Sequence, residues 1–460
     1  MTVRAFSEFQ VADAWFCECV PHSPVNFTPG ESIFPHNPDR TTRTLATQTH
    51  LGQTTAFSSN DFLLFCIKKE LYHMLTHAGC RERQSRLWQR LPDEILWVLI
   101  GDARHVQYFS NFRINPISFS ADQKSLLLLT RDGQAILLAD NFAKRSATVP
   151  CFVDQEVIIP WYTHKKSVTN RDDVLCLALT EIEHVWSGTT GLIEPEGVSE
   201  MVAAMVAEDA AWQFAEDDNE QPTTLGTLIR SLRRSKHADE VELLKTCMRA
   251  GEAGHRRAFE VIKPGVSELE VYLEVQRAAQ ETAGCACIVY GDFRATNAKL
   301  HKAGGLPTQY RLQDGDLFIL DYSVIIHGYR SDFTNTISVG APSDKIVAQF
   351  EACRDAMAAA AAMLKAGAAC RDLWQAASAV LESRGFGSLA HHAGHGLALE
   401  HPEPPILVSE SDDTLVVGDV ITLEPGCYIE GQGGMRFEHN YLIAENGSEQ
   451  LSQHHIGLTL

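Results

Sequence analysis

The sequence has no long apolar run. No window approaches the roughly 18 uninterrupted apolar residues of a transmembrane helix, so we expect none. Positive charge is also scarce, with 39 Lys and Arg against 59 Asp and Glu and a net charge of −20. This balance argues against nucleic acid or an anionic membrane as partner. The first residues, MTVRAFSEFQ, lack the apolar core of a secretory signal, and we therefore expect a cytoplasmic protein.

Closely spaced cysteines are few. Twelve cysteines are scattered along the chain, and only Cys17/Cys19 and Cys285/Cys287 lie close together. A C-x-C pair without a second pair or a nearby His is a weak zinc signal. We therefore interpret the cysteines as free thiols of a reduced cytoplasm.

The chain is too long, at 460 residues, for one ordinary core, and we expect two domains. Residues 1–60 lack periodicity and predict an irregular extension. Residues 61–216 mix strands and helices and predict an α/β N-terminal domain. The acidic run EDDNEQPTT starts at the boundary, so 217–236 form a linker or connecting helix and 237–460 a second domain.

Periodicity predicts the individual elements. The N-terminal domain is expected to contain a helix at 81–91, a strand at 95–101, a strand–turn–strand unit at 125–140 and a helix at 198–216. The C-terminal domain is expected to contain a helix at 237–261, a helix from the capping box Ser267-x-x-Glu270 to about 282, strands at 286–291 and 316–339, and a helix at 341–365. Helices and strands in separate runs predict an α+β fold.

The stretch DYSVIIHGYRSD, residues 321–332, carries the first candidate site. Aliphatic and aromatic residues at 317–326 predict a buried strand. His327-Gly328 predicts a two-residue turn because Gly accepts positive φ. The chain then returns as a second strand that extends to Val339.

This turn fixes the register of the hairpin. Ile326 pairs with Tyr329, and side chains alternate between the two faces of the ladder. Asp321, opposite Thr334, therefore points to the same face as Asp332. Two carboxylates on a mostly apolar face resist burial, and a cation between them removes that cost. The alternative is a solvent-facing sheet with two unremarkable Asp residues.

Further candidate ligands follow towards the C-terminus. The segment HHAGHGLALEHPEPP, residues 391–405, contains four histidines. Glu424 lies in TLEPGCY and Glu438 in GMRFEHN, and a loop centred on Gly431 would set these two carboxylates opposite each other, although Pro425 interrupts the pairing. Each residue alone has a plainer interpretation, such as a solvated Glu or a hydrogen-bonded His.

Taken together, four acids and the glycine-flanked His395 form a mixed oxygen and imidazole set. Such sets suit Mn²⁺, Co²⁺, Fe²⁺ or Zn²⁺. Four negative charges exceed what one divalent ion neutralises. Two ions about 3.5–4 Å apart would balance the charge, activate a water and polarise a carbonyl oxygen.

The chain resembles the pita-bread metallopeptidases: prolidase, aminopeptidase P, methionine aminopeptidase and their metal-free relative creatinase. The resemblance covers about 235–455 and rests on GHGLALE, LEPGCY and GGMRFE, and on five ordered residues: Asp321, Asp332, His395, Glu424 and Glu438. Residues 70–215, with YFSNF at 108–112, resemble the extra N-terminal domain of prolidase, aminopeptidase P and creatinase.

The resemblance implies a role for each matching residue. Asp321 would chelate one ion, His395 and Glu424 would hold the other, and Asp332 and Glu438 would bridge the two. Glu424 would also act as general base. Three further residues have implied roles: His301 would lie near the substrate, His391 would steady the tetrahedral intermediate, and Arg436 would lie near the metal site and bind substrate. The ions would be Mn²⁺ in the first place, with Co²⁺, Zn²⁺ and Fe²⁺ as alternatives.

The sequence departs from the family pattern at several positions. Ala398 replaces the second Gly of the GHGxG motif, and Asn335 stands where an Arg is common. The histidine expected seven residues after His395 is Pro402, and His401 precedes it by one position. In a regular strand His401 would face away from the metals. Pro404 and Pro405 make a regular strand unfavourable here and favour a bulge that turns His401 back.

The resemblance implies a metal-dependent exopeptidase that cuts Xaa-Pro bonds. Two alternatives remain open: a hydrolase or lyase of a small non-peptide molecule on the same metal site, and a non-catalytic binding relative. The expected partners are a peptide or small-molecule substrate and, by resemblance, a second copy of the chain in a homodimer.

Overall fold

The computed structural model describes residues 74–118, 123–147, 149–165, 168–215 and 221–459. The extension predicted at 1–60 and the boundary predicted at 216–217 lie outside these residues and stay predictions. Among the described residues, no helix combines the length and apolarity needed to cross a membrane.

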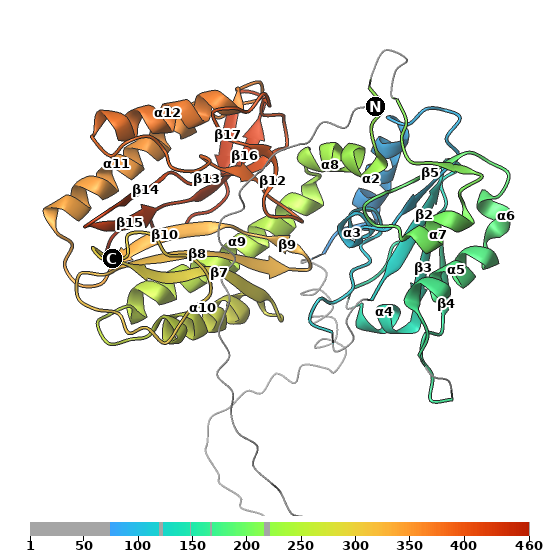
Figure 1. Ribbon diagram of the computed structural model, residues 1–460, viewed down its shortest axis with the longest axis horizontal. Helices are drawn as coiled ribbons and strands as arrows, with labels where there is room; N and C mark the ends of the chain where they lie inside the picture. Colours follow the sequence, from blue (N-terminus) through green and yellow to red (C-terminus); the bar gives the residue numbers. More distant parts are fainter. Residues whose placement is uncertain (1–73, 119–122, 148, 166–167, 216–220, 460) are drawn as a thin grey trace, which may run out of the picture. The chain divides into compact units, whose positions relative to one another are not determined.

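The N-terminal part is built around one mixed six-stranded sheet with the order β4-β3-β2-β1-β5-β6 (Figure 1). Its strands are β1 Trp97–Ile100, β2 Ser125–Thr130, β3 Ala135–Asp140, β4 Gln155–Ile159, β5 Gly191–Ile193 and β6 Ala210–Ala211. Its helices are α2 His77–Trp88, α3 Ala103–Ser110, α4 Asn141–Ser146, α5 Arg171–Glu181, α6 Glu183–Trp186 and α7 Glu200–Met205. Strands β1, β2 and β3 are buried along their whole length, as their continuous apolar runs require.

The single helix predicted at 198–216 is wrong. Helix α7 ends at Met205, and the chain then forms strand β6, in which Ala210 pairs with Gly191 of β5. The apolar residues Val202, Ala203 and Val206 are buried in a core cluster. Hydrogen bonding at the edge of the sheet therefore prevails over the helix propensity of the alanine-rich sequence.

The C-terminal part contains three sheets and five helices among the described residues. Its helices are α8 Leu225–Arg234, α9 Ala238–Val261, α10 Glu268–Ala283, α11 Asp344–Ala361 and α12 Cys370–Ser383. Its strands are β7 Ile288–Thr296, β8 Leu317–Ile326, β9 Tyr329–Arg330, β10 Phe333–Ser338, β11 His395–Gly396, β12 Glu403–Ile406, β13 Val420–Leu423, β14 Gly426–Ile429, β15 Gly433–Arg436, β16 His439–Ala444 and β17 Gly447–Gln450. Separate groups of helices and strands confirm the α+β fold.

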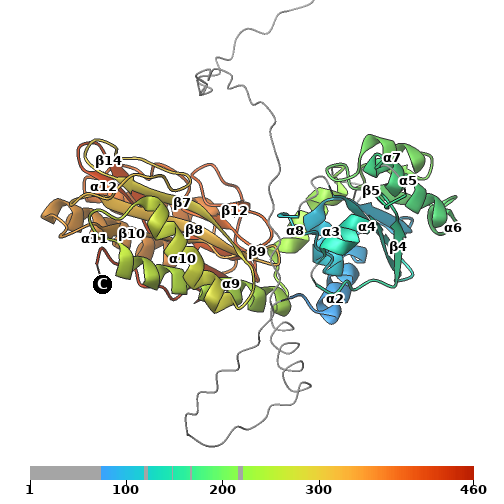
Figure 2. The ribbon, with the colours of Figure 1, turned by 90° about the horizontal axis from the view of Figure 1, so that it is seen from below.

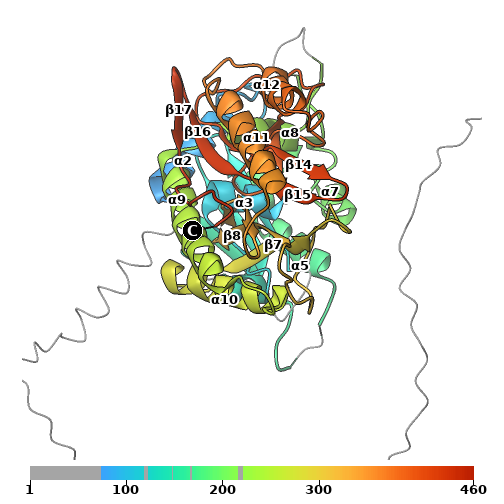
Figure 3. The same cartoon turned by 90° about the vertical axis from the view of Figure 1, so that its left-hand side faces the viewer.

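Two helix pairs cover the strands. Helices α9 and α10 pack side by side against the β7–β8 hairpin (Figures 1 and 2). Helices α11 and α12 form the second pair, with the strands lying between the two pairs (Figure 3). The predicted capping box is present at the start of α10, where Ser267 and Glu270 each accept from the backbone N–H of the other. Sequence reasoning missed helix α12.

The predicted register of the aspartate hairpin is confirmed. Ile326 pairs with Tyr329, and Asp321 pairs with Thr334. His327 and Gly328 both have positive φ, 47° and 86°, as a tight turn of this kind demands. The returning strand is interrupted just before Phe333, where the ladder resumes in the same register. Asp321 therefore reaches the site from β8, and Asp332 reaches it from the break between β9 and β10.

The second predicted hairpin also has the expected register. Gly426 pairs with Arg436 and Thr422 pairs with Asn440, which places Glu424 level with Glu438. The ladder is interrupted between these two pairs, next to Pro425, and its two halves belong to different sheets. The two carboxylates therefore lie at the junction of those sheets.

Candidate metal centre

A cavity of about 410 Å³ opens at this junction. All five residues of the predicted ligand set line it: Asp321, Asp332, His395, Glu424 and Glu438. The five residues come from both hairpins and from β11. The two hairpins are joined by a hydrogen bond from the hydroxyl of Thr334 to Glu438, which is 104 positions further along the chain. Five polar side chains that converge in one cavity exclude the interpretation of the aspartates as solvent-facing strand residues.

The described residues contain four triads of possible ligand atoms, and two of these triads consist of predicted ligands alone. His395, Glu424 and Glu438 form one, and Asp321, Asp332 and Glu438 form the other, each with its ligand atoms within 4.8 Å of one another. Glu438 belongs to both triads. The five predicted ligands therefore form one continuous group around a shared carboxylate.

His395 is oriented for coordination through one ring nitrogen. Its Nδ1 lies 2.9 Å from the backbone oxygen of Gly396, to which it donates. Its Nε2 is then free of a proton and lies 3.3 Å from Glu424 and 3.6 Å from Asp332. A histidine whose second nitrogen donates to a carbonyl is the usual form of an imidazole ligand.

Burial makes the carboxylates of this cavity costly as anions. It raises the pKa of Asp321 to about 7 and raises the pKa values of Glu424 and Glu438. Glu438 Oε1 is buried without a hydrogen-bond partner among the described residues. Divalent cations would supply both the missing partner and the missing positive charge, so the residues present fit a metal centre.

Arg436 is one of two arginines that line the cavity, with Arg330. It forms an ion pair with Asp321, approaches Asp292 to 3.3 Å, and donates to the hydroxyl of Tyr428 at 3.0 Å. Its neighbouring carboxylates outweigh the effect of burial and raise its pKa well above the usual value. Arg436 therefore balances part of the negative charge from the Asp321 side.

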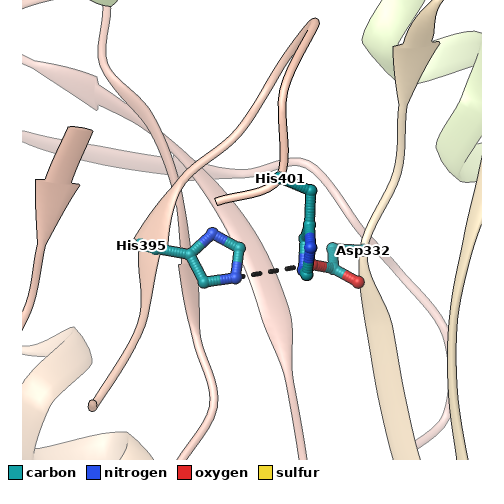
Figure 4. A group of neighbouring side chains, drawn as sticks. All are labelled: Asp332, His395 and His401. Atoms are coloured by element: carbon teal, nitrogen blue, oxygen red, sulfur yellow. Dashed lines mark ion pairs between the residues drawn. The ribbon is translucent and has the colours of Figure 1, made fainter. Parts of the chain in front are cut away.

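His401 faces the centre (Figure 4). Its Nε2 lies 2.8 Å from Asp332 Oδ2, and its ring contacts that of His395 edge-on at 4.7 Å. The register of β11 against β12 shifts between His395 and Gly396, opposite the segment that contains Pro404 and Pro405. His401 lies just before β12, outside the regular ladder, so strand alternation does not decide its direction. Pro402 also lines the cavity.

The other two histidines with implied roles do not line the cavity. His301 lies between β7 and β8, outside the lining. His391 uses its Nδ1 in a contact of 2.7 Å with the backbone oxygen of His392, and its Nε2 lies 3.4 Å from the hydroxyl of Tyr428. Burial lowers the pKa of His391 to about 4, so its ring is neutral at neutral pH.

Sequence reasoning missed His392 as a site residue. It lines the cavity, and its Nδ1 lies 3.4 Å from Glu424 Oε1. The four-histidine segment predicts ligands in this region, but spacing alone does not separate His392 from its neighbour His391. The chain direction at Ala393 is fixed by backbone bonds to Leu407 and Glu424, and a ligand atom of each ring lies within 4.8 Å of a carboxylate oxygen of Glu424.

An α+β domain with this ligand set has the architecture of the pita-bread metallopeptidases. Residues 242–445 match the model of Metallopeptidase family M24, in agreement with the resemblance found in the sequence. The Xaa-Pro dipeptidase of Pyrococcus furiosus is 32% identical over 232 residues, which are 49% of this chain and 65% of that protein. An uncharacterized peptidase of Bacillus subtilis is 30% identical over 225 residues, 49% of this chain and 64% of that protein. The alignments thus span just under two thirds of these relatives.

Solved structures show the same fold over a longer stretch. The prolidase of Pyrococcus horikoshii has a TM-score of 0.62 at 23% identity and covers 82% of this chain and 99% of its own. The X-Pro aminopeptidase of Thermotoga maritima has a TM-score of 0.65 at 21% identity, with coverage of 82% and 99%. Because this coverage extends beyond residues 242–445, the likeness includes the N-terminal α/β part.

Proposed function

We propose that this protein is a metal-dependent exopeptidase that hydrolyses Xaa-Pro bonds. The observation that carries the proposal is the convergence of four carboxylates and His395 in one cavity, in two triads that share Glu438. The names of the Pyrococcus furiosus and Pyrococcus horikoshii relatives support the Xaa-Pro specificity.

Two divalent cations held by the two triads, Mn²⁺ in the first place, would lower the pKa of a bound water and polarise the scissile carbonyl. The protein residues do the rest. Glu424 has a pKa raised by burial, which brings its basicity closer to neutral pH and suits a general base. Thr422 donates its hydroxyl to Glu424 Oε1 at 3.2 Å and holds that carboxylate in place.

His401 can supply a proton to the substrate. Burial alone would lower its pKa, but the hydrogen bond to Asp332 raises it. Its ring therefore carries a proton over a wider pH range and can donate to an oxygen on which negative charge develops. Half-exposed to solvent at 40%, it can turn from Asp332 towards a substrate at the cavity mouth.

A substrate screen of metal-loaded protein tests the proposal. Xaa-Pro dipeptides, longer Xaa-Pro peptides and ordinary dipeptides are compared at equal concentration. We expect turnover of one or both Xaa-Pro classes and none of the ordinary dipeptides, and the preferred length separates a prolidase-like from an aminopeptidase P-like enzyme. The variant Asp321→Asn, loaded in the same way, controls for contaminating peptidases.

Two outcomes would contradict this assignment. Equal turnover of ordinary dipeptides would remove the Xaa-Pro specificity. No peptide turnover by protein that binds two ions would favour the alternative of a small non-peptide substrate.

A further inference from the structure

Two imidazole nitrogens converge on one carboxylate oxygen in this centre. Glu424 Oε1 lies 3.3 Å from Nε2 of His395 and 3.4 Å from Nδ1 of His392. The two rings meet edge to face, with centroids 5.4 Å apart. A cation next to Glu424 Oε1 would therefore lie within reach of a nitrogen from each ring.

Nδ1 of His392 has no other task among the described residues. It is buried and has no hydrogen-bond partner there. A buried polar atom without a partner destabilises the folded state, so an arrangement that leaves one needs a reason. The side chain of His392 as a whole is 36% exposed to solvent.

The backbone around His392 fixes the direction of its ring. Its carbonyl oxygen lies 2.7 Å from Nδ1 of His391, the next residue, Ala393, donates to Leu407 at 2.7 Å, and the Ala393 oxygen accepts from Glu424 N at 2.9 Å. His392 is therefore tied through its neighbour to the same residue that its ring approaches. A ring held in this way is pre-organised for a ligand.

We propose that His392 is an additional ligand, through Nδ1, of the cation held by His395 and Glu424. This inference rests on the metal centre of the proposed function. With His392, the two cation positions differ in chemistry. One has two imidazoles and the carboxylates of Glu424 and Glu438, whereas the other has the carboxylates of Asp321, Asp332 and Glu438, with His401 beside Asp332.

This asymmetry predicts two positions with different metal preferences. Imidazole suits Zn²⁺ and Co²⁺, and a set of carboxylates suits Mn²⁺. The position with His392 should bind Zn²⁺ and Co²⁺ much more tightly than Mn²⁺. The position with Asp321, Asp332 and Glu438 should discriminate less between these ions.

Metal binding by full-length protein tests the inference without an activity measurement. Metal-free wild type, His392→Ala and His392→Gln are titrated with Co²⁺, Zn²⁺ and Mn²⁺ against a chromophoric chelator. We expect His392→Ala to lower the affinity of the tighter position for Co²⁺ and Zn²⁺ by about 10- to 100-fold and to change the visible absorption of bound Co²⁺. The affinity for Mn²⁺ should fall by less than about threefold, because carboxylates dominate its binding. The exposed His184→Ala on α6 serves as the control for loss of a histidine.

The glutamine variant separates coordination from orientation. Gln can hydrogen-bond to Glu424 but is a poor ligand for these ions, so we expect it to resemble His392→Ala. Restoration of wild-type affinity by Gln, or an equal loss for all three ions, would show that His392 only orients Glu424 and would overturn the inference. Unchanged affinity in both variants would overturn it as well.

A measurement on the wild type does not depend on the folding of any variant. In protein labelled with ¹⁵N-histidine, Zn²⁺ should shift one resonance of an Nε2-bound ring, from His395, and one of an Nδ1-bound ring, from His392. Absence of the Nδ1 shift in protein that binds zinc overturns the role of His392 alone. Absence of any metal binding by the wild type would instead overturn the centre itself.

Discussion

Arg233 of helix α8 forms a buried ion pair with Glu403 of strand β12, 170 residues further along the chain. The two side chains are 2% and 3% exposed. Glu403 also accepts from the backbone N–H groups of Leu399 and Glu400, at 2.9 and 2.8 Å. The pair therefore holds the turn that presents His401 to the centre.

The first prediction concerns this pair. Arg233→Met should lower the free energy of unfolding by up to about 3–5 kcal/mol, because Glu403 would keep only the more distant Lys236, at 3.6 Å, as a positive partner. Arg230→Met on the same helix is the matched control. Its pair with Glu196 is about one third exposed on both sides and should contribute less than about 1 kcal/mol. Thermal and urea melts measure both, and equal shifts would contradict the structural role of Arg233.

The second prediction concerns Asp332. Asp332→Ala should abolish activity, lower the metal stoichiometry from two ions to one or fewer, and leave the circular dichroism spectrum unchanged. Asp332 contacts both His395 and His401 and shares a triad with Asp321, so its loss removes a group between both cation positions. Asp344→Ala, on the exposed first turn of α11, is the control. Near wild-type turnover in the Asp332 variant would refute the ligand assignment.

The registers of both hairpins followed from local sequence. A turn residue that accepts positive φ, Gly328 in one hairpin and Gly431 in the other, sets which residues face each other, and alternation then sets the face. Asp321 and Glu438 were found in this way, because each lies within about ten residues of its turn.

Features that depend on distant pairing were not predictable from the sequence. Arg233 and Glu403 are surrounded by unremarkable local patterns, and their pairing depends on how α8 meets β12. The placement of His391 and His392 beside Glu424 depends on backbone bonds of Ala393 to Leu407 and Glu424. The helix predicted at 198–216 was wrong for the same reason, because β5 offers a sheet edge that no local pattern reveals.

The third prediction concerns pH and the metal-free protein. Burial raises the pKa of Asp321 from 3.8 to about 7 and also raises the pKa values of Glu424 and Glu438. The folded state then binds more protons than the unfolded state between about pH 4 and 7. Stability contributed by these protonated acids is present at low pH and is lost as pH rises through the folded pKa values. His401, with its raised pKa, acts in the same direction.

These groups should therefore lower the melting temperature of the metal-free protein between pH 5 and pH 8, against the opposite contribution of buried histidines whose pKa is lowered, such as His391 and His439. Mn²⁺ binds the deprotonated carboxylates, so it should raise the melting temperature more at pH 8 than at pH 5. Differential scanning calorimetry with and without Mn²⁺ measures both trends. A metal-free protein that becomes more stable from pH 5 to pH 8 would show that these acids are not the dominant titrating groups.

The last prediction concerns His401. His401→Ala should lower kcat/KM for an Xaa-Pro substrate by about 10²-fold, a typical loss for one positioned donor. Its Nε2 lies 2.8 Å from Asp332, and it forms a triad with Asp332 and His395, but all five predicted ligands remain in the variant, which should therefore still bind two ions. Metal stoichiometry and kcat/KM are measured on the same preparation. Loss of an ion would make His401 a ligand, and an unchanged rate would mean that no histidine assists at this position, which would favour a small non-peptide substrate over an Xaa-Pro peptide.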